Sequence, residues 1–184
     1  MTTLAKFKAM LRGEDWMVLD TETTGLEHGE IVQIAIVHRL GDVLLNTLVK
    51  PKEPIPPSAT AIHGITDDMV IDAFTWQDVR NTVFDILYGR NIVIYNAVYD
   101  RKMMHQSGER WGMPKTDWKE IASFWCAMEA FAECYGGYSE YRQSYRWQKL
   151  STAAHYYRIQ QKDAHTALDD AETTRQLCLA MASE

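Results

Sequence analysis

Residues 16–25 read WMVLDTETTG, with four apolar residues followed by two acids that one threonine separates. The uninterrupted apolar run predicts a short strand that is buried on both faces. Alternate side chains of an extended strand point to the same face, so the carboxylates of Asp20 and Glu22 converge at its end. No Lys or Arg occurs between Arg12 and Arg39 to neutralise this pair.

Two neighbouring carboxylates repel each other, so either one of them holds a proton or a cation lies between them. Ligands that are all oxygen favour a hard ion such as Mg²⁺ or Mn²⁺. The plainer interpretation is a strand end that runs into a polar turn, Thr23-Thr24-Gly25. The pair alone does not decide between a metal site and a turn.

The rest of the chain alternates helical and strand patterns. Apolar spacing predicts a short helix over 4–11, and two β-rich runs predict a hairpin of 31–40 with 43–49. Residues 51–57 hold four of the five prolines and predict a surface loop. A helix over 76–87, a buried strand over 91–95 and a helix over 97–106 are expected next.

The C-terminal third is harder to interpret from its pattern. Residues 118–125 fit a strand or a helix start, with a helix following to about Tyr135. Residues 136–147 are polar and aromatic and predict an insertion or loop, and 148–157 and 166–181 predict two closing helices. This order predicts one α/β domain over 1–184, with its motifs within about 16–181.

The composition is that of a globular protein, with 46% hydrophobic and 24% charged residues. A formal net charge of −6 counts against a protein that coats nucleic acid electrostatically, but not against an enzyme that handles one strand end. No run approaches 18 apolar residues, and the N-terminus has no signal-peptide pattern. The number of cysteines is odd, which predicts free thiols in a reducing cytoplasm: Cys126, Cys134 and Cys178.

Further acids stand at two predicted helix starts. Asp100 follows the second buried strand and the N-cap candidate Asn96, where a lone acid is more often solvated and favoured by the helix dipole. In HTALDDA (165–171), Thr166 and Asp169 fit a capping box, which leaves His165 just before the helix and Asp170 within it. The plainer interpretation of His165 is a surface histidine. Together these groups are consistent with a two-metal phosphoryl-transfer site.

Four segments in this order resemble the DnaQ-like 3′–5′ exonucleases, in the histidine subclass of the DEDD type (DEDDh). The resemblance spans about 16–181 and rests on these stretches: 20–25 (DTETTG), 61–66 (AIHGIT), 95–100 (YNAVYD) and 165–171 (HTALDDA). The second stretch resembles the loop that this family has between its hairpin and the next helix.

The resemblance implies an RNase H-like fold with a central five-stranded mixed sheet flanked by helices. It implies that two Mg²⁺ or Mn²⁺ ions are held by Asp20, Glu22, Asp100 and Asp170, with His165 as the general base. It also implies that the terminal nucleotide is contacted by Thr21, Thr23, Leu26, His63, Ile65 and Asn96. The products would be nucleoside 5′-monophosphates.

The resemblance does not determine how the substrate is contacted. Tyr95 stands where the family commonly has His before Asn, at a position that is not a metal ligand. The aromatic and basic residues of 135–149 either stack bases and touch phosphates or pack against the closing helix. DNA 3′ ends are favoured over RNA only because similar stand-alone members often act on DNA. The sequence leaves the oligomeric state open, with a homodimer among the options, and predicts no membrane contact.

Three other functions remain in view. An RNA 3′–5′ exonuclease would have the same fold. An aspartate-nucleophile phosphatase would have a second Asp where Glu22 stands, and it gives His165 no role. A non-catalytic nucleic-acid-binding module would be expected to lack at least one of the five candidate catalytic residues, and all five are present.

Overall fold

The computed structural model describes residues 1–162 and 165–183. Helices and strands alternate along most of the chain, in this order: α1 (Thr3–Leu11), β1 (Trp16–Thr23), β2 (Ile31–His38), β3 (Val43–Lys50), α2 (Pro57–His63), α3 (Asp67–Val70), β4 (Phe74–Thr75), α4 (Trp76–Leu87), β5 (Asn91–Ile94), α5 (Ala97–Arg110), α6 (Trp118–Ile121), β6 (Ser123–Cys126), α7 (Ala127–Tyr135), β7 (Tyr138–Ser139), β8 (Ser144–Tyr145), α8 (Leu150–Tyr156) and α9 (Ala167–Ala182).

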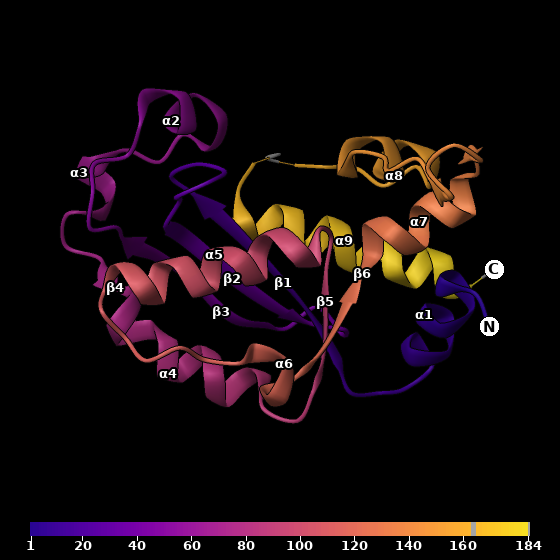
Figure 1. The fold of residues 1–184 in the computed structure, drawn as a ribbon, viewed down its shortest axis with the longest axis horizontal. Coiled ribbons are helices and arrows are strands. Elements are labelled where there is room, and N and C mark those ends of the chain that lie inside the picture. Colours follow the sequence, from indigo (N-terminus) through magenta and orange to yellow (C-terminus); the bar gives the residue numbers. More distant parts are fainter. Residues whose placement is uncertain (163–164, 184) are drawn as a thin grey trace.

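A mixed sheet runs through the molecule in the order β4-β3-β2-β1-β5-β6 (Figure 1). β1, β2 and β3 are antiparallel neighbours, whereas β5 and β6 continue the sheet parallel to β1. The mixed α/β fold is confirmed, but the expected count of five strands is wrong, because the sheet has six. The additional strand is β4, whose two residues pair parallel with β3 at the edge. Such a short strand exists only through its pairing and leaves no periodic pattern in the sequence.

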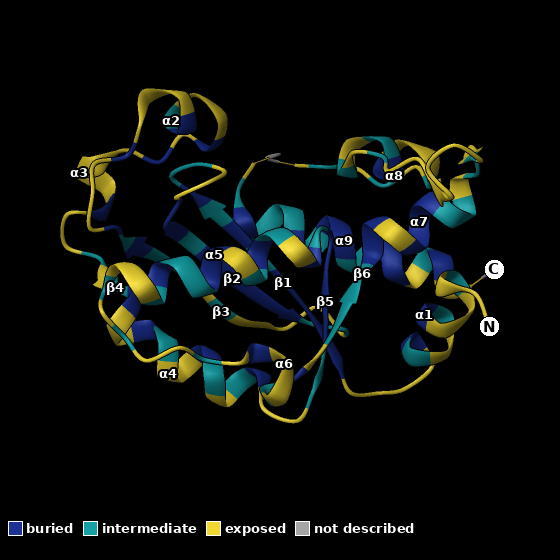
Figure 2. Ribbon diagram, in the orientation of Figure 1, coloured by how far each residue is buried: buried dark blue, intermediate teal, exposed yellow. Residues whose placement is uncertain are grey.

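Helices cover both faces of the sheet (Figures 1 and 2). β1 supplies side chains to the cores on both faces. Trp16 and Val18 point into the core cluster formed with α1, α7, α8 and α9. Met17 and Leu19 point into the cluster formed with α4, α5 and α6. Burial on both sides explains why this strand is continuously apolar rather than alternating.

Most predicted elements are confirmed within a few residues, including α1, the β2–β3 hairpin, α4, β5, α7 and α9. Residues 118–125, where helix and strand were both open, contain one turn of helix followed by β6. The segment expected as a loop at 136–147 forms a two-stranded ribbon of β7 and β8. Within the described ranges, no helix is long and apolar enough to cross a membrane.

Candidate active site

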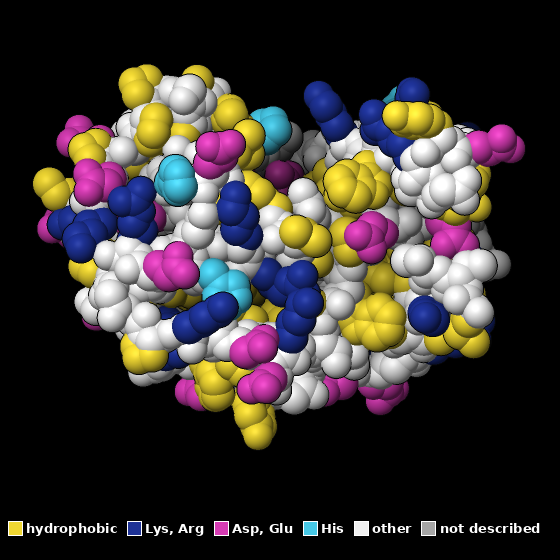
Figure 3. All heavy atoms as spheres, viewed as in Figure 1, with side chains coloured by type: hydrophobic (Ala, Val, Ile, Leu, Met, Phe, Trp, Pro, Cys, Tyr) yellow, Lys and Arg dark blue, Asp and Glu magenta, His cyan; other side chains and the backbone are white. Residues whose placement is uncertain are grey.

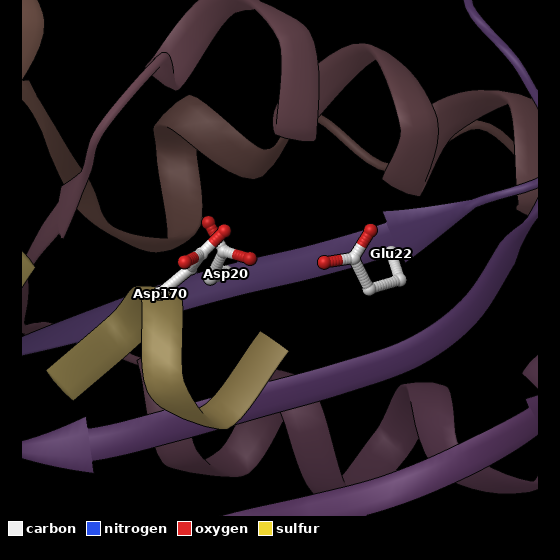
Figure 4. A group of neighbouring side chains, drawn as sticks. All are labelled: Asp20, Glu22 and Asp170. Atoms are coloured by element: carbon white, nitrogen blue, oxygen red, sulfur yellow. The ribbon is translucent and has the colours of Figure 1, made fainter. Parts of the chain in front are cut away.

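The end of β1 and the first turn of α9 bring three carboxylates together. Asp20 and Glu22 continue the face of β1 on which α9 packs, and Asp170 projects toward them from α9 (Figure 4). One carboxylate oxygen from each residue lies within 4.8 Å of the other two. The two-residue period of the strand therefore produces the convergence that the sequence indicated.

The start of α9 is fixed by hydrogen bonds. The Thr166 hydroxyl accepts from the Asp169 backbone N–H at 3.2 Å, as the capping pattern predicted. The Ala167 N–H donates to the side-chain oxygen of Gln33, which lies opposite Glu22 in the β1–β2 register. Because of these contacts, the N-terminus of α9 and its Asp170 are held against the sheet.

Asp100 approaches from the other face of β1. It lies in the first turn of α5, is only 4% exposed, and accepts a 2.8 Å hydrogen bond from the Thr21 hydroxyl. Thr21 points away from Asp20 and Glu22 because side chains alternate along the strand. The interpretation of Asp100 as a solvated acid is therefore wrong. Its charge acts on Asp20 and Glu22, but it stands outside the group of three.

His165 lies immediately before the α9 cap. Its backbone adopts a left-handed conformation with φ of 74°, and its side chain is exposed. Its backbone donates a hydrogen bond to the Asp170 carboxylate. The main chain of His165 therefore contacts the acidic cluster, while its imidazole is exposed to solvent.

The carboxylates strongly disfavour one another's ionisation. Burial, followed by the charges of Asp100, Asp170 and Glu22, raises the pKa of Asp20 well above its usual range. Burial and the charges of Asp170 and Asp100 raise the pKa of Glu22 to about 8. Burial also raises the pKa of Asp170, with His165 as a partial offset.

No Lys or Arg among the described residues forms an ion pair with these four acids. A cluster of partly buried, mutually repelling oxygens without a cationic side chain fits a divalent cation. The site therefore implies dependence on a divalent metal.

This repulsion sets an expected pH dependence of stability. The Glu22 pKa is about 8 in the folded state against 4.5 ordinarily, so between these values the folded chain binds more protons than the unfolded chain. Ionisation of Glu22 should therefore cost the metal-free protein stability, and this loss should accumulate as the pH rises from about 4.5 through about 8. We expect its melting temperature at pH 8.5 to lie several degrees below that at pH 6, and a divalent cation to restore it.

Differential scanning calorimetry of wild type and Glu22→Gln, each with EDTA and with Mg²⁺, measures this effect. The variant should show a smaller difference between the two pH values, because one titrating group is gone while Asp100, whose pKa burial raises to about 7, remains. A metal-free wild type that becomes more stable from pH 6 to 8.5 would contradict the assigned repulsion.

A groove of about 550 Å³ lies beside the acids, between the end of β1 and α2. This volume is within the ~300–1,000 Å³ typical of small-ligand sites. Of the six predicted contact residues, four line it: Thr21, Thr23, Leu26 and His63. Nδ1 of His63 accepts from the Ile65 N–H, and burial lowers the His63 pKa, which favours a neutral imidazole.

The other two predicted contacts do not line this groove. Ile65 is buried in a separate core cluster with Val32 and Ile55. Asn96 is the N-cap residue of α5, and its carbonyl accepts from Tyr99 N–H. The groove instead contains Ile62, because residues 61–63 form the end of α2 rather than a loop. Pro57 at the first helical position was the available signal for this helix.

A row of polar side chains on α5 holds the loop that carries Leu26. Four successive carbonyls, of residues 25, 26, 27 and 28, accept in turn from four side chains one helical turn apart: Tyr99, Lys102, Gln106 and Arg110. The Tyr99 hydroxyl also pairs with the Thr23 hydroxyl at 2.5 Å. These hydrogen bonds fix the backbone of the loop. The side chain of Leu26 is nevertheless 74% exposed at the groove. Tyr99 was not among the predicted site residues, since its role depends on this loop.

Comparison with known proteins agrees with this geometry. A family model described as "Exonuclease", of the RNase T type, matches residues 17–178. Uncharacterized exonuclease CP81 of Escherichia phage 186 is 39% identical over 92% of this chain and 89% of that protein. The DNA polymerase III subunit epsilon of Salmonella typhimurium (strain LT2) is 29% identical over 90% of this chain and 70% of that subunit. Some other relatives are covered over less than half of their length.

A solved structure with the same fold is that of Exonuclease X in complex with 5′ overhanging duplex DNA. It matches with a TM-score of 0.64 and 25% identity, over 92% of each chain. The predicted DnaQ-like resemblance, the RNase H-like fold and the enzyme class are thereby confirmed. The chain belongs to the RNase T exonuclease family, as a nucleic-acid-binding hydrolase of the 3′–5′ exonuclease class.

Proposed function

We propose that this protein removes nucleotides one at a time from the 3′ end of DNA and releases nucleoside 5′-monophosphates. The observation that carries the proposal is the cluster of Asp20, Glu22 and Asp170 beside a groove of nucleotide size. DNA is favoured because relatives named above are a DNA polymerase subunit and a nuclease solved with DNA.

We propose Mg²⁺ or Mn²⁺ as the bound ions, held by Asp20, Glu22, Asp170 and Asp100. Their ligands are all carboxylate oxygens, which suit hard cations. When bound, such ions lower the pKa of a coordinated water and stabilise charge on the oxygens of the transferred phosphate.

In the proposed mechanism, the terminal nucleotide occupies the groove between Leu26 on the α5-braced loop and His63 on α2. The side chain of His165 takes the proton from the attacking water. The water oxygen forms a bond to phosphorus as the bond between phosphorus and the 3′ oxygen of the preceding nucleotide breaks. That oxygen gains a proton, which leaves a shortened strand with a free 3′ hydroxyl.

The test is degradation of 5′-labelled single-stranded DNA, duplex DNA and RNA of the same sequence, with Mg²⁺, Mn²⁺ or EDTA. We expect a metal-dependent ladder that shortens from the 3′ end and is fastest on DNA. A ladder seen only with RNA would overturn the proposed substrate but retain the enzyme class. No degradation of any polymer by folded protein would support a binding module instead.

A further inference from the structure

The β7–β8 ribbon, defined here as residues 136–149, exposes aromatic side chains that the core does not use. Tyr141 is 97% exposed, Trp147 63%, Tyr138 49% and Tyr145 37%. The alternative that these rings pack against the closing helix is therefore wrong for Tyr141 and Trp147, whereas Tyr135, just before the ribbon, does contact Tyr156 of α8. Monomeric proteins rarely expose several large apolar side chains next to one another. A group of exposed rings on one ribbon therefore indicates a surface that binds another molecule.

The ribbon is also basic, although the whole chain carries a formal charge of −6. It contains Arg142, Arg146 and Lys149 and a single acid, Glu140. Elsewhere, Arg39, Arg90 and Arg175 pair with acids. In the described part of the chain, the guanidinium groups of Arg142 and Arg146 have no such partner.

Aromatic and basic side chains of the ribbon line the same cavity. A cavity of about 630 Å³ is lined by Ser139, Ser144, Tyr145, Trp147 and the two arginines. Figure 3 shows dark-blue Lys and Arg side chains beside yellow hydrophobic ones over α8 and this segment. Flat rings next to cations are the combination with which proteins hold single-stranded nucleic acid, since bases stack on the rings and phosphates lie against the charges.

The ribbon is anchored to the elements that carry the acids. Tyr95, at the end of β5, donates a 2.9 Å hydrogen bond to the Gln148 carbonyl as the chain leaves the ribbon. α8 follows directly and packs on α9, which carries Asp170. In Figure 1, the start of α9 lies between α2 on one side and α8 with the ribbon on the other, along one edge of the molecule.

We propose that the β7–β8 ribbon is a second binding site, for the single-stranded part of the substrate upstream of its 3′-terminal nucleotide. This inference rests on the proposed function only in taking the groove as the place of the 3′ end. The ribbon then gives affinity that grows with strand length, while the groove alone binds the last nucleotides. The contacts are with phosphates and base faces, so they serve any sequence.

The experiment measures binding of 5′-fluorescein oligothymidylates from 2 to 12 nucleotides by fluorescence anisotropy, in Ca²⁺ buffer, with a gel to verify intact strands. Three proteins are compared: wild type, Tyr141→Ser/Trp147→Ser and Arg142→Ser/Arg146→Ser. Matched controls remove an exposed ring or two exposed cations far from the ribbon: Tyr88→Ser and Lys115→Ser/Lys119→Ser. Oligouridylate 12-mers are measured in parallel to compare the two sugars.

We expect the aromatic pair of substitutions to weaken 12-mer binding at least about tenfold and dinucleotide binding less than twofold. The arginine pair should lower the slope of log affinity against log salt by about 1.4, since each single-strand phosphate contact contributes ~0.7. The control variants should match wild type. Ribbon variants that bind the 12-mer within twofold of wild type, or that lose dinucleotide binding equally, would overturn the proposal.

Hydrolysis of the dinucleotide and of the 12-mer is measured on the same proteins with Mg²⁺. If wild type degrades neither, the proposed function fails, while the binding data still decide the role of the ribbon. If wild type degrades both, the ribbon variants should lose rate only on the longer strand, through a higher KM.

Discussion

Asp20→Asn is expected to reduce 3′-end hydrolysis by roughly 10³- to 10⁵-fold while it raises the melting temperature of the metal-free protein. The loss follows because the charges of all three other acids act on Asp20, which places it among the proposed metal ligands, and metal ions contribute several kcal/mol of transition-state stabilisation. The gain follows because burial and three neighbouring charges oppose its ionisation, and the neutral isostere removes that repulsion.

The two effects have opposite signs, which separates a lost metal site from a damaged fold. Rates on a 5′-labelled oligonucleotide and melting curves in EDTA are measured together. Asp72→Asn, which removes one exposed charge elsewhere, should change neither quantity. A variant that loses activity and also melts at a lower temperature would show that Asp20 is structural, and one that keeps wild-type rate would remove it from the site.

The same residues explain how much of this site the sequence predicts. Asp20, Glu22 and Asp170 were identifiable because each stands at a local boundary, a strand end or a capped helix start, whose geometry is set by its neighbours. The alternation of side chains along β1 places the first two on one face without any tertiary information.

Other features depend on contacts between distant segments. The burial of Asp100 and its hydrogen bond with Thr21, 79 residues away, arise from the packing of α5 on β1, which no local pattern reveals. Ile62 rather than Ile65 lines the groove because 57–63 is helical, and the proline-rich stretch 51–57 was interpreted as a loop although Pro57 can begin a helix. The ribbon was expected as a loop, since its two-residue strands are too short to show a period.

His165→Asn is expected to reduce the hydrolysis rate by roughly 10²- to 10⁴-fold with little change in metal affinity, because general base catalysis contributes about that factor. Asparagine is chosen because His165 has a φ of 74°, a conformation that asparagine tolerates better than alanine. The backbone hydrogen bond to Asp170 should therefore persist in this variant. His155→Asn, at an exposed histidine of α8, is the matched control.

Comparison of His165→Asn with His165→Ala separates the imidazole from the main chain that carries it. If the imidazole takes the proton, both variants should be equally slow, and their rates should rise with hydroxide concentration because no side chain replaces the base. If His165 acts only by holding Asp170, asparagine should retain most of the rate and alanine should not. Wild-type rates across the pH range in both variants would exclude His165 from catalysis altogether and leave the acids and their ions to activate the water alone.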